Sequence, residues 1–485
     1  MNRTALRSIP LAFLAFTFIL SGATCTVPLA PGFQILKESR EVKFIPGKPS
    51  ELQIRANFTL DNNGNGDLTF IDAVFPDEKA FGRKNLRAQV SGRDAQLSNL
   101  PEEYQFGSPN TLRIPLDHPW TRHERRELVI EYSLSSPADS GSRITLGDAN
   151  FHLANRGWFP VLQPPKHALS PFPKRPDKTI VTISLPNNFL VLSRGKPAGR
   201  KEAAGEIEHR FLLRQADLAP FVVAGRYSVS PSNMFWTLQP LKDNPAPAEA
   251  RINALWTAMQ TDFGPLDKNI SAPHIVESPE LRTHFDDEEA AAAASFPGGA
   301  LVNSQALALG VSSDAFLEIV AHALAHNWFG EELYFASEAA LGLGEGLPDY
   351  ATIVIDEARA GESARRQRIL KFLREYNEAC KQAVESPLGV TKMTDPPPQR
   401  RIARSKAPLL FIALEDSYGE APIREGLKNL VTLLRGQEAS YDEVRAALEQ
   451  STGKNLAEPF RTWLYDKGIP QDFRARYESA PESHP

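Results

Sequence analysis

The most informative part of the sequence is His322-Ala-Leu-Ala-His326-Asn-Trp-Phe-Gly330, followed by Glu345. Its apolar periodicity predicts a helix over residues 314–328. Residues four apart lie on one face of a helix, so His322 and His326 can reach the same metal ion. Glu345 follows with 18 residues between it and His326, enough for a turn and a second helix that presents its carboxylate to the same ion.

These three side chains form a donor set that is typical of a zinc site. Zinc in hydrolytic sites takes three protein ligands and leaves a fourth position open for water. Helices with the pattern H-E-x-x-H place a glutamate general base directly after the first histidine. Here that position is Ala323, so the stretch predicts zinc binding without the usual base. The histidine pair alone is a weak signal, and the spaced Glu345 strengthens it.

Length, charge and the first residues set the broad class. The 485 residues predict two or three domains. The net charge of −5 and the lack of a basic block argue against nucleic-acid binding. Residues 1–23 combine Arg3 and Arg7 with an apolar run and a small-residue end, which predicts a signal peptide. After signal removal, no apolar run is long enough to be a transmembrane span.

The signal predicts export to the periplasm or the extracellular space. The two cysteines are Cys25 and Cys380. Cys25 follows the signal directly, so a lipid anchor at Cys25 is an alternative to a freely secreted protein, although Gly22-Ala23-Thr24 fits a lipoprotein site poorly. A Cys25–Cys380 disulfide is a weaker alternative, because mature N-termini are usually mobile.

Periodicity divides the mature chain into two parts. Residues 24–230 predict a β-rich N-terminal domain, an antiparallel saddle or sandwich, from alternating segments at 127–134, 143–153, 179–185 and 221–229. Residues 231–247 are a proline-rich linker. Residues 248–475 predict an α+β domain with a strand at 274–278, and residues 476–485 form a tail. Its helices are expected at 248–263, 314–328, 341–360, 363–384, 423–435, 441–450 and 456–465.

The chain resembles the membrane alanyl aminopeptidase family of zinc metallopeptidases, the gluzincins. The family motif HELAHQWFG with a later NEG corresponds here to HALAHNWFG and Gly344-Glu345-Gly346. Three further landmarks occur in order: Trp158-Phe159-Pro160, Phe263-Gly264-Pro265, and Phe460-Arg-Thr-Trp463 with Gly468-Ile-Pro470. The resemblance covers about residues 30–475. It implies a thermolysin-like α+β metallopeptidase domain and one zinc per chain, held by His322, His326 and Glu345.

The resemblance also identifies what this chain lacks. Ala323 stands at the general-base position, and losing a general base costs roughly 10²–10⁴ in rate. Arg404 stands at the position of the tyrosine that stabilises the oxyanion. The family strand GAMEN, whose glutamate holds the substrate's amino terminus, corresponds to Gly299-Ala-Leu-Val-Asn303. The substrate-binding residues implied by this match are Gly299, Ala300, Val302 and Asn303.

The sequence leaves three functional hypotheses. The first is an exported zinc-binding pseudoenzyme that binds a peptide or protein ligand in its cleft. The second is an active zinc aminopeptidase that uses metal-activated water or a relocated base. The third is a structural or binding domain without metal. Candidate bases are Glu331, Glu332 and the acids at 286–289, and a solvated surface charge is the plainer interpretation of each.

Arg404 belongs to a local cluster of cations in the sequence. Arg400, Arg401 and Lys406 surround it, after a run of three prolines at 396–398. The plainer interpretation is a solvated loop. The alternative is a cleft for carboxylate or phosphate groups, since arginine forms bidentate contacts with both.

Overall fold

The structure is a computed structural model that describes residues 32–76, 78–100, 110–135, 144–153, 157–163, 174–203, 205–214, 221–266, 272–279, 281 and 292–478. The expected signal peptide, Cys25 and the acids at 286–289 lie outside these residues. Among the described residues, no helix is both long and apolar enough to cross a bilayer.

An eight-stranded sheet dominates the N-terminal half. Its order is β14 (Lys196–Ala203), β15 (Glu206–Arg214), β12 (Lys178–Pro186), β1 (Gln34–Ile45), β2 (Glu51–Asp61), β8 (Arg125–Leu134), β4 (Lys84–Val90) and β5 (Arg93–Ala95). Neighbouring strands are antiparallel except β1 and β12, which pair in parallel. Alternate side chains of β12 are buried, as period-two patterning requires when one sheet face meets a core.

Two four-stranded sheets complete this half. One has the order β13 (Leu190–Ser193), β16 (Val222–Gly225), β10 (Asn150–Leu153) and β9 (Ile144–Leu146), and the other has the order β11 (Val161–Gln163), β3 (Leu68–Val74), β7 (Thr111–Trp120) and β6 (Ser98–Asn99). Helix α1 (Glu78–Phe81) is a single turn. All three sheets share one hydrophobic core, in which Phe44 stacks on Phe151 with ring centroids 5.4 Å apart. The β-rich N-terminal domain is therefore confirmed.

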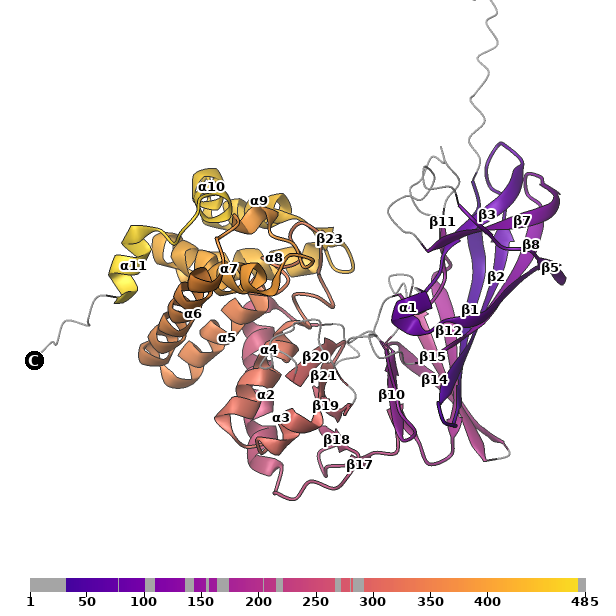
Figure 1. Cartoon of the computed structure of the whole chain (residues 1–485), viewed down its shortest axis with the longest axis horizontal. Coiled ribbons are helices and arrows are strands. Elements are labelled where there is room, and N and C mark those ends of the chain that lie inside the picture. The colour runs from indigo at the N-terminus through magenta and orange to yellow at the C-terminus, as the bar shows by residue number, and fades with distance from the viewer. Residues whose placement is uncertain are drawn as a thin grey trace, which may run out of the picture.

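A five-stranded sheet follows, next to the first helices of the C-terminal half (Figure 1). Its order is β17 (Ser228–Val229), β18 (Phe235–Thr237), β19 (His274–Glu277), β21 (Gly299–Val302) and β20 (Ala293–Phe296). Strand β19 runs parallel to β18 and β21, and β20 is antiparallel to β21. Strand β18 falls inside the segment predicted as a linker, residues 231–247. The domain boundaries themselves stay a prediction.

Helices form most of the rest of the chain. They are α2 (Ala246–Phe263), α3 (Ser304–Ala308), α4 (Asp314–Ala325), α5 (Gly346–Ala360), α6 (Glu362–Gln382), a 3-10 turn (Leu388–Val390), α7 (Pro397–Tyr418), α8 (Glu420–Leu433), α9 (Tyr441–Thr452), α10 (Ala457–Tyr465) and α11 (Gln471–Glu478). The short strands β22 (Tyr334–Phe335) and β23 (Glu438–Ala439) pair in parallel. One hydrophobic core joins these helices to the five-stranded sheet, which gives the predicted α+β domain.

One loop interpretation and one helix boundary need correction. The segment 400–406, interpreted as a solvated loop, lies inside α7, and Lys406 is 0% exposed. The prolines and polar residues at the start of α7 obscure its helical period, and residues 409–414 form a continuous apolar run without one. The helix expected over 341–360 begins at Gly346, because the preceding residues form turns.

Candidate metal centre

Helix α4 carries the two histidines on one face. It begins at Ser313, whose side-chain oxygen accepts a hydrogen bond from the Phe316 amide at 3.1 Å. His322 lies in its last turn and His326 is its C-cap residue. The imidazole ring centroids are 4.8 Å apart, with planes at 81°. Gly330 has φ +154°, and a Cβ there would lie 3.3 Å from His326 Nδ1, so glycine leaves room for the ring.

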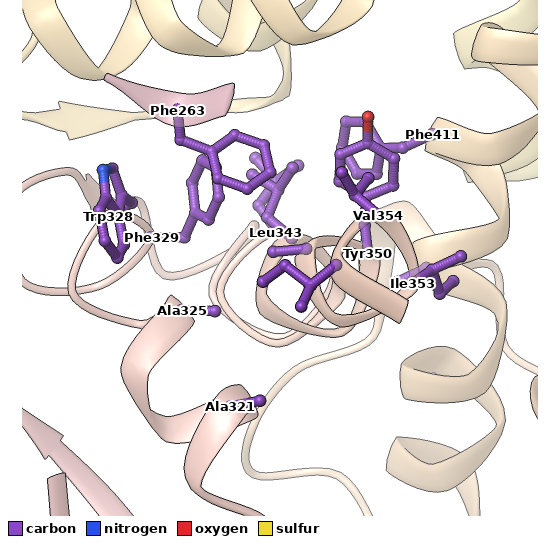
Figure 2. Close-up of a cluster of buried hydrophobic side chains, with 14 of the residues drawn as sticks. Phe263, Ala321, Ala325, Trp328, Phe329, Leu343, Tyr350, Ile353, Val354 and Phe411 are labelled. Atoms are coloured by element: carbon purple, nitrogen blue, oxygen red, sulfur yellow. The ribbon is translucent and has the colours of Figure 1, made fainter. Parts of the chain in front are cut away.

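The residues that follow His326 in the motif anchor the helix end in the core. Trp328 Nε1 donates to the Gly264 carbonyl at 2.7 Å, and its ring packs edge-on against Trp256. Phe329 packs against Phe263 with ring centroids 5.1 Å apart. Figure 2 shows Phe263, Trp328 and Phe329 within this buried cluster. The aromatic part of the motif therefore fixes the end of α4 by packing.

Glu345 reaches the histidines from the N-cap position of α5. A Cβ on the next residue, Gly346, would lie only 2.5 Å from the Cβ of Ala407 in α7. The two helices therefore approach closely here, and the approach requires a glycine. Because Arg404 lies one turn before Ala407, this contact also brings Arg404 beside Glu345.

The donor atoms of the three predicted ligands converge. His322 Nε2 lies 3.1 Å from His326 Nε2, and Glu345 Oε2 lies 3.4 Å and 3.8 Å from these two nitrogens. A zinc ion bound at its usual distances would separate tetrahedral donors by about 3.3 Å. Among the described residues, these three offer ligand atoms that all lie within 4.8 Å of one another. The donor set fits zinc in type and in spacing.

Hydrogen bonds at the far side of each ring fix the imidazole tautomers. His322 Nδ1 lies 2.7 Å from Asp349 Oδ1, and His326 Nδ1 lies 3.2 Å from the Phe329 carbonyl. Both partners are acceptors, so each Nδ1 carries a hydrogen and each neutral ring turns the lone pair of its Nε2 to the centre. The two Nε2 atoms lie 3.1 Å apart, and their lone pairs repel each other unless a cation or a proton lies between them. A metal ion meets that need.

Burial and charge separate the pKa values of the two imidazoles. Burial lowers the pKa of His326 to about 4. Burial also opposes protonation of His322, but the adjacent Asp349 carboxylate outweighs it and raises the pKa of His322 to about 9. Burial works against ionisation of Glu345, yet His326, His322 and Arg404 hold the pKa of its carboxyl below the usual range. Glu345 is therefore an anionic donor at neutral pH.

Arg404 lies against this donor set. Its Nε donates to Asp349 Oδ2 at 3.2 Å and lies 3.9 Å from Glu345 Oε2. Its Nη2 lies 3.5 Å from His322 Nε2. Two other cations of the sequence cluster contact different groups: Lys406 donates to Glu385 Oε1 and to the Asp466 carbonyl, and Arg401 donates to Gln382. The cluster is thus divided among different faces of α7.

The predicted substrate-binding residues lie in and after β21, where all are buried. Ala300 and Val302 are 0% exposed and pack in the helical core. Asn303 caps α3 by accepting from the Ala306 amide at 2.9 Å. Gly299 is tied to the metal helix, since Asn327 Nδ2 donates to its carbonyl at 3.2 Å. Their role in substrate binding stays a prediction.

Two of the candidate replacement bases, Glu331 and Glu332, are engaged elsewhere. Glu331 accepts from Ser295 Oγ at 2.8 Å. Glu332 is 1% exposed and pairs with Arg194 at 3.4 Å and Arg435 at 3.2 Å. The interpretation of Glu331 and Glu332 as solvated surface charges is wrong, because both side chains are buried in polar contacts. Ala323 is also buried, at 2% exposure.

Asp349 is the site residue that the sequence analysis missed. It lies four residues after Glu345, which on a helix places both carboxylates on one face, so the i, i+4 spacing was an available signal. We expect Asp349→Asn to weaken zinc binding about 10- to 100-fold, the usual effect of losing an acceptor behind a ligating histidine. Competition with a chromogenic chelator measures this.

Asp356→Asn is the matched control for that substitution. Asp356 lies two turns further along α5 and pairs with Arg368 at 2.7 Å, away from the donor set. Its replacement should leave zinc affinity unchanged. Equal affinities for the Asp349 variant and the parent protein would show that Asp349 does not orient His322.

Comparisons with known proteins agree with this geometry. Residues 298–463 match the peptidase family M1 domain. The M1 zinc metallopeptidase from Deinococcus radiodurans has a similar structure, with a TM-score of 0.61 and 15% identity over 90% of this chain and 95% of that chain. A glutamate-to-alanine mutant from that organism, bound to a Tyr-Ser-Ala substrate, is also similar. Its TM-score is 0.60 and its sequence identity is 15%, over 90% of this chain and 95% of that chain.

A two-domain M1 zinc metallopeptidase mutant bound to L-tryptophan is also similar, with a TM-score of 0.61 and 16% identity over 90% of this chain and 96% of that chain. No curated protein sequence matches the chain. At these identities the solved structures establish the fold, while the domain match and the His-His-Glu cluster establish the kind of metal centre. Residues 298–463 are therefore a peptidase family M1 domain, and the chain has the fold of the two-domain M1 zinc metallopeptidases.

Proposed function

We propose that this chain is an exported zinc-binding M1 homologue that binds peptides and hydrolyses them very slowly or not at all. The observation that carries the proposal is the convergent donor set beside an alanine at the base position. His322, His326 and Glu345 would hold the zinc ion. Bound zinc supplies a Lewis acid and lowers the pKa of a bound water to about 7.

The chain's own residues explain the expected lack of turnover. Ala323 has no group that can accept a proton, and such a loss costs roughly 10²–10⁴ in rate. Asp349 is engaged by His322 and Arg404, so it orients a ligand instead of acting as a base. Glu331 and Glu332 are held by Ser295 and by two arginines.

A peptide or protein ligand is the proposed partner of the cleft. The structures of relatives hold a Tyr-Ser-Ala substrate, L-tryptophan or L-arginine. Residues 299–303 remain the proposed substrate-binding stretch. Since Val302 is buried, this stretch would contribute through its backbone instead of through that side chain. Export rests on residues 1–23 and a lipid anchor on Cys25.

We expect the purified protein to contain about one zinc ion per chain and to show negligible turnover of aminoacyl amides and short peptides. Elemental analysis measures the metal, and a broad peptide panel followed by mass spectrometry measures cleavage. Turnover near the 1–10³ s⁻¹ typical of active enzymes would contradict the pseudoenzyme proposal. A protein that neither contains zinc nor takes it up at micromolar concentrations would contradict the metal proposal.

A further inference from the structure

The guanidinium of Arg404 adds a fixed positive charge at the donor set. It lies 3.5 Å from one proposed metal ligand, His322 Nε2, and 3.9 Å from another, Glu345 Oε2. Its Nε donates a hydrogen bond to Asp349 Oδ2 at 3.2 Å. About a quarter of the side chain, 27%, is exposed, so the group faces both the metal centre and solvent.

Bound zinc would place a second cation beside Arg404. Zinc would bring two positive charges, while Glu345 and Asp349 each bring one negative charge. Glu375 also interacts electrostatically with Arg404, and it shares Lys371 with Glu318. The alanine at position 323 adds no negative charge. Two adjacent cations in a partly buried place favour binding of an anion.

The geometry also selects the kind of anion. Zinc accepts carboxylate oxygen as a ligand. Arginine presents donors in a planar fork that matches a carboxylate. An ammonium group would meet two positive centres here, and the side chain of Val302 is buried and uncharged.

We propose that the cleft binds ligands through a carboxylate that zinc and Arg404 recognise together, and that it disfavours a free amino group at the same place. The inference rests on the proposed zinc site and adds the ligand class. The carboxylate is either a peptide C-terminus or an acidic side chain, because both present the same chemistry.

The cobalt-substituted protein tests this without requiring turnover, because the visible spectrum of bound Co(II) changes when its ligands change. N-acetyl-alanine offers only an α-carboxylate, N-acetyl-glutamate α-amide only a side-chain carboxylate, and alanine amide only an amine. We expect one or both carboxylates to shift the spectrum saturably, and alanine amide to leave it unchanged at the same concentration. The carboxylate that binds more tightly identifies the source.

Variants of Arg404 then separate its role from that of the metal. Arg404→Met should retain cobalt and weaken carboxylate binding about 10- to 100-fold, the range for lost hydrogen bonds to a charged group. Arg404→Lys should fold, since it keeps the positive charge. It should lose part of the affinity for carboxylates, because a compact ammonium replaces the planar guanidinium with its paired donors. Arg401→Met, on the same helix but directed to Gln382 at 3.3 Å, should match the parent protein.

Each outcome bears on a different claim. A parent protein that takes up neither zinc nor cobalt overturns the proposed function itself. A protein that binds metal but shows no response to either carboxylate overturns the inference alone. Carboxylate binding that is equal in the parent and in Arg404→Met, with metal retained, also overturns it.

Discussion

Replacing His326 by alanine should abolish zinc retention. His326 supplies one of three donors, and its Nε2 lies 3.1 Å from that of His322 and 3.8 Å from Glu345 Oε2. Two protein ligands cannot complete the three-ligand set of such a site. Because loss of an acceptor behind a ligand already costs about 10- to 100-fold, loss of the ligand should exceed that range.

Elemental analysis and chelator competition measure this loss, and thermal unfolding gives an independent readout. Zinc at about 100 times its dissociation constant should stabilise the parent protein by about 2.7 kcal/mol and leave His326→Ala unaffected. The control is His118→Ala, since His118 is 60% exposed in the N-terminal β-rich half and pairs with Asp117. Zinc uptake by His326→Ala equal to that of the control would refute the assignment of this residue.

The metal ligands could be predicted from sequence because their signal is local. His322 and His326 need only a helix to meet, and the helix follows from capping at Ser313 and from apolar periodicity. Glu345 was reached through its spacing from His326, which leaves room for a turn and a second helix, and the family resemblance strengthened that assignment. Asp349 was one helical turn from Glu345, yet its function depends on the orientation of α4 against α5.

The features that the sequence could not supply are all tertiary. Arg404 faces the donor set because Gly346 lets α7 approach α5, which is a contact between residues 61 positions apart. Lys406 appears solvated in a basic run, yet it is 0% exposed because Glu385 and the Asp466 carbonyl accept its hydrogen bonds. Helix periodicity within α7 was obscured because buried ionic contacts replace the apolar face that usually identifies a core helix.

A cluster of ion pairs around Glu415 should contribute strongly to the stability of the helical half. Glu415 in α7 is 3% exposed and accepts from Tyr350 at 2.6 Å, Arg365 at 2.9 Å and Arg424 at 2.9 Å. These partners come from α5, α6 and α8, so one carboxylate joins four helices. Burial raises the pKa of Tyr350 well above its usual value, so its hydroxyl stays a donor.

We therefore expect Glu415→Gln to destabilise the protein by about 3–5 kcal/mol, the usual cost of removing one partner from a buried ion pair. The physical reason is that Arg365 is buried and Arg424 mostly so, and both would lose the most buried of their carboxylate partners while Glu357 and Glu420 remain. At roughly 2–4 °C per kcal/mol for a domain of this size, the melting temperature should fall by about 6–20 °C. Differential scanning calorimetry measures the shift.

Glu420→Gln is the matched control, because Glu420 meets the same two arginines, at 3.1 Å and 3.4 Å, but its side chain is 48% exposed. Exposed pairs contribute about 0–1 kcal/mol, so its melting temperature should change by no more than a few degrees. Equal shifts for the two variants would show that burial does not determine the contribution of Glu415.

Tyr350, which donates to Glu415, follows Asp349 directly in α5. We therefore expect Glu415→Gln to lose some zinc affinity, though less than Asp349→Asn, and Glu420→Gln to lose none. That difference would connect the buried cluster to the orientation of the metal centre through a single helix.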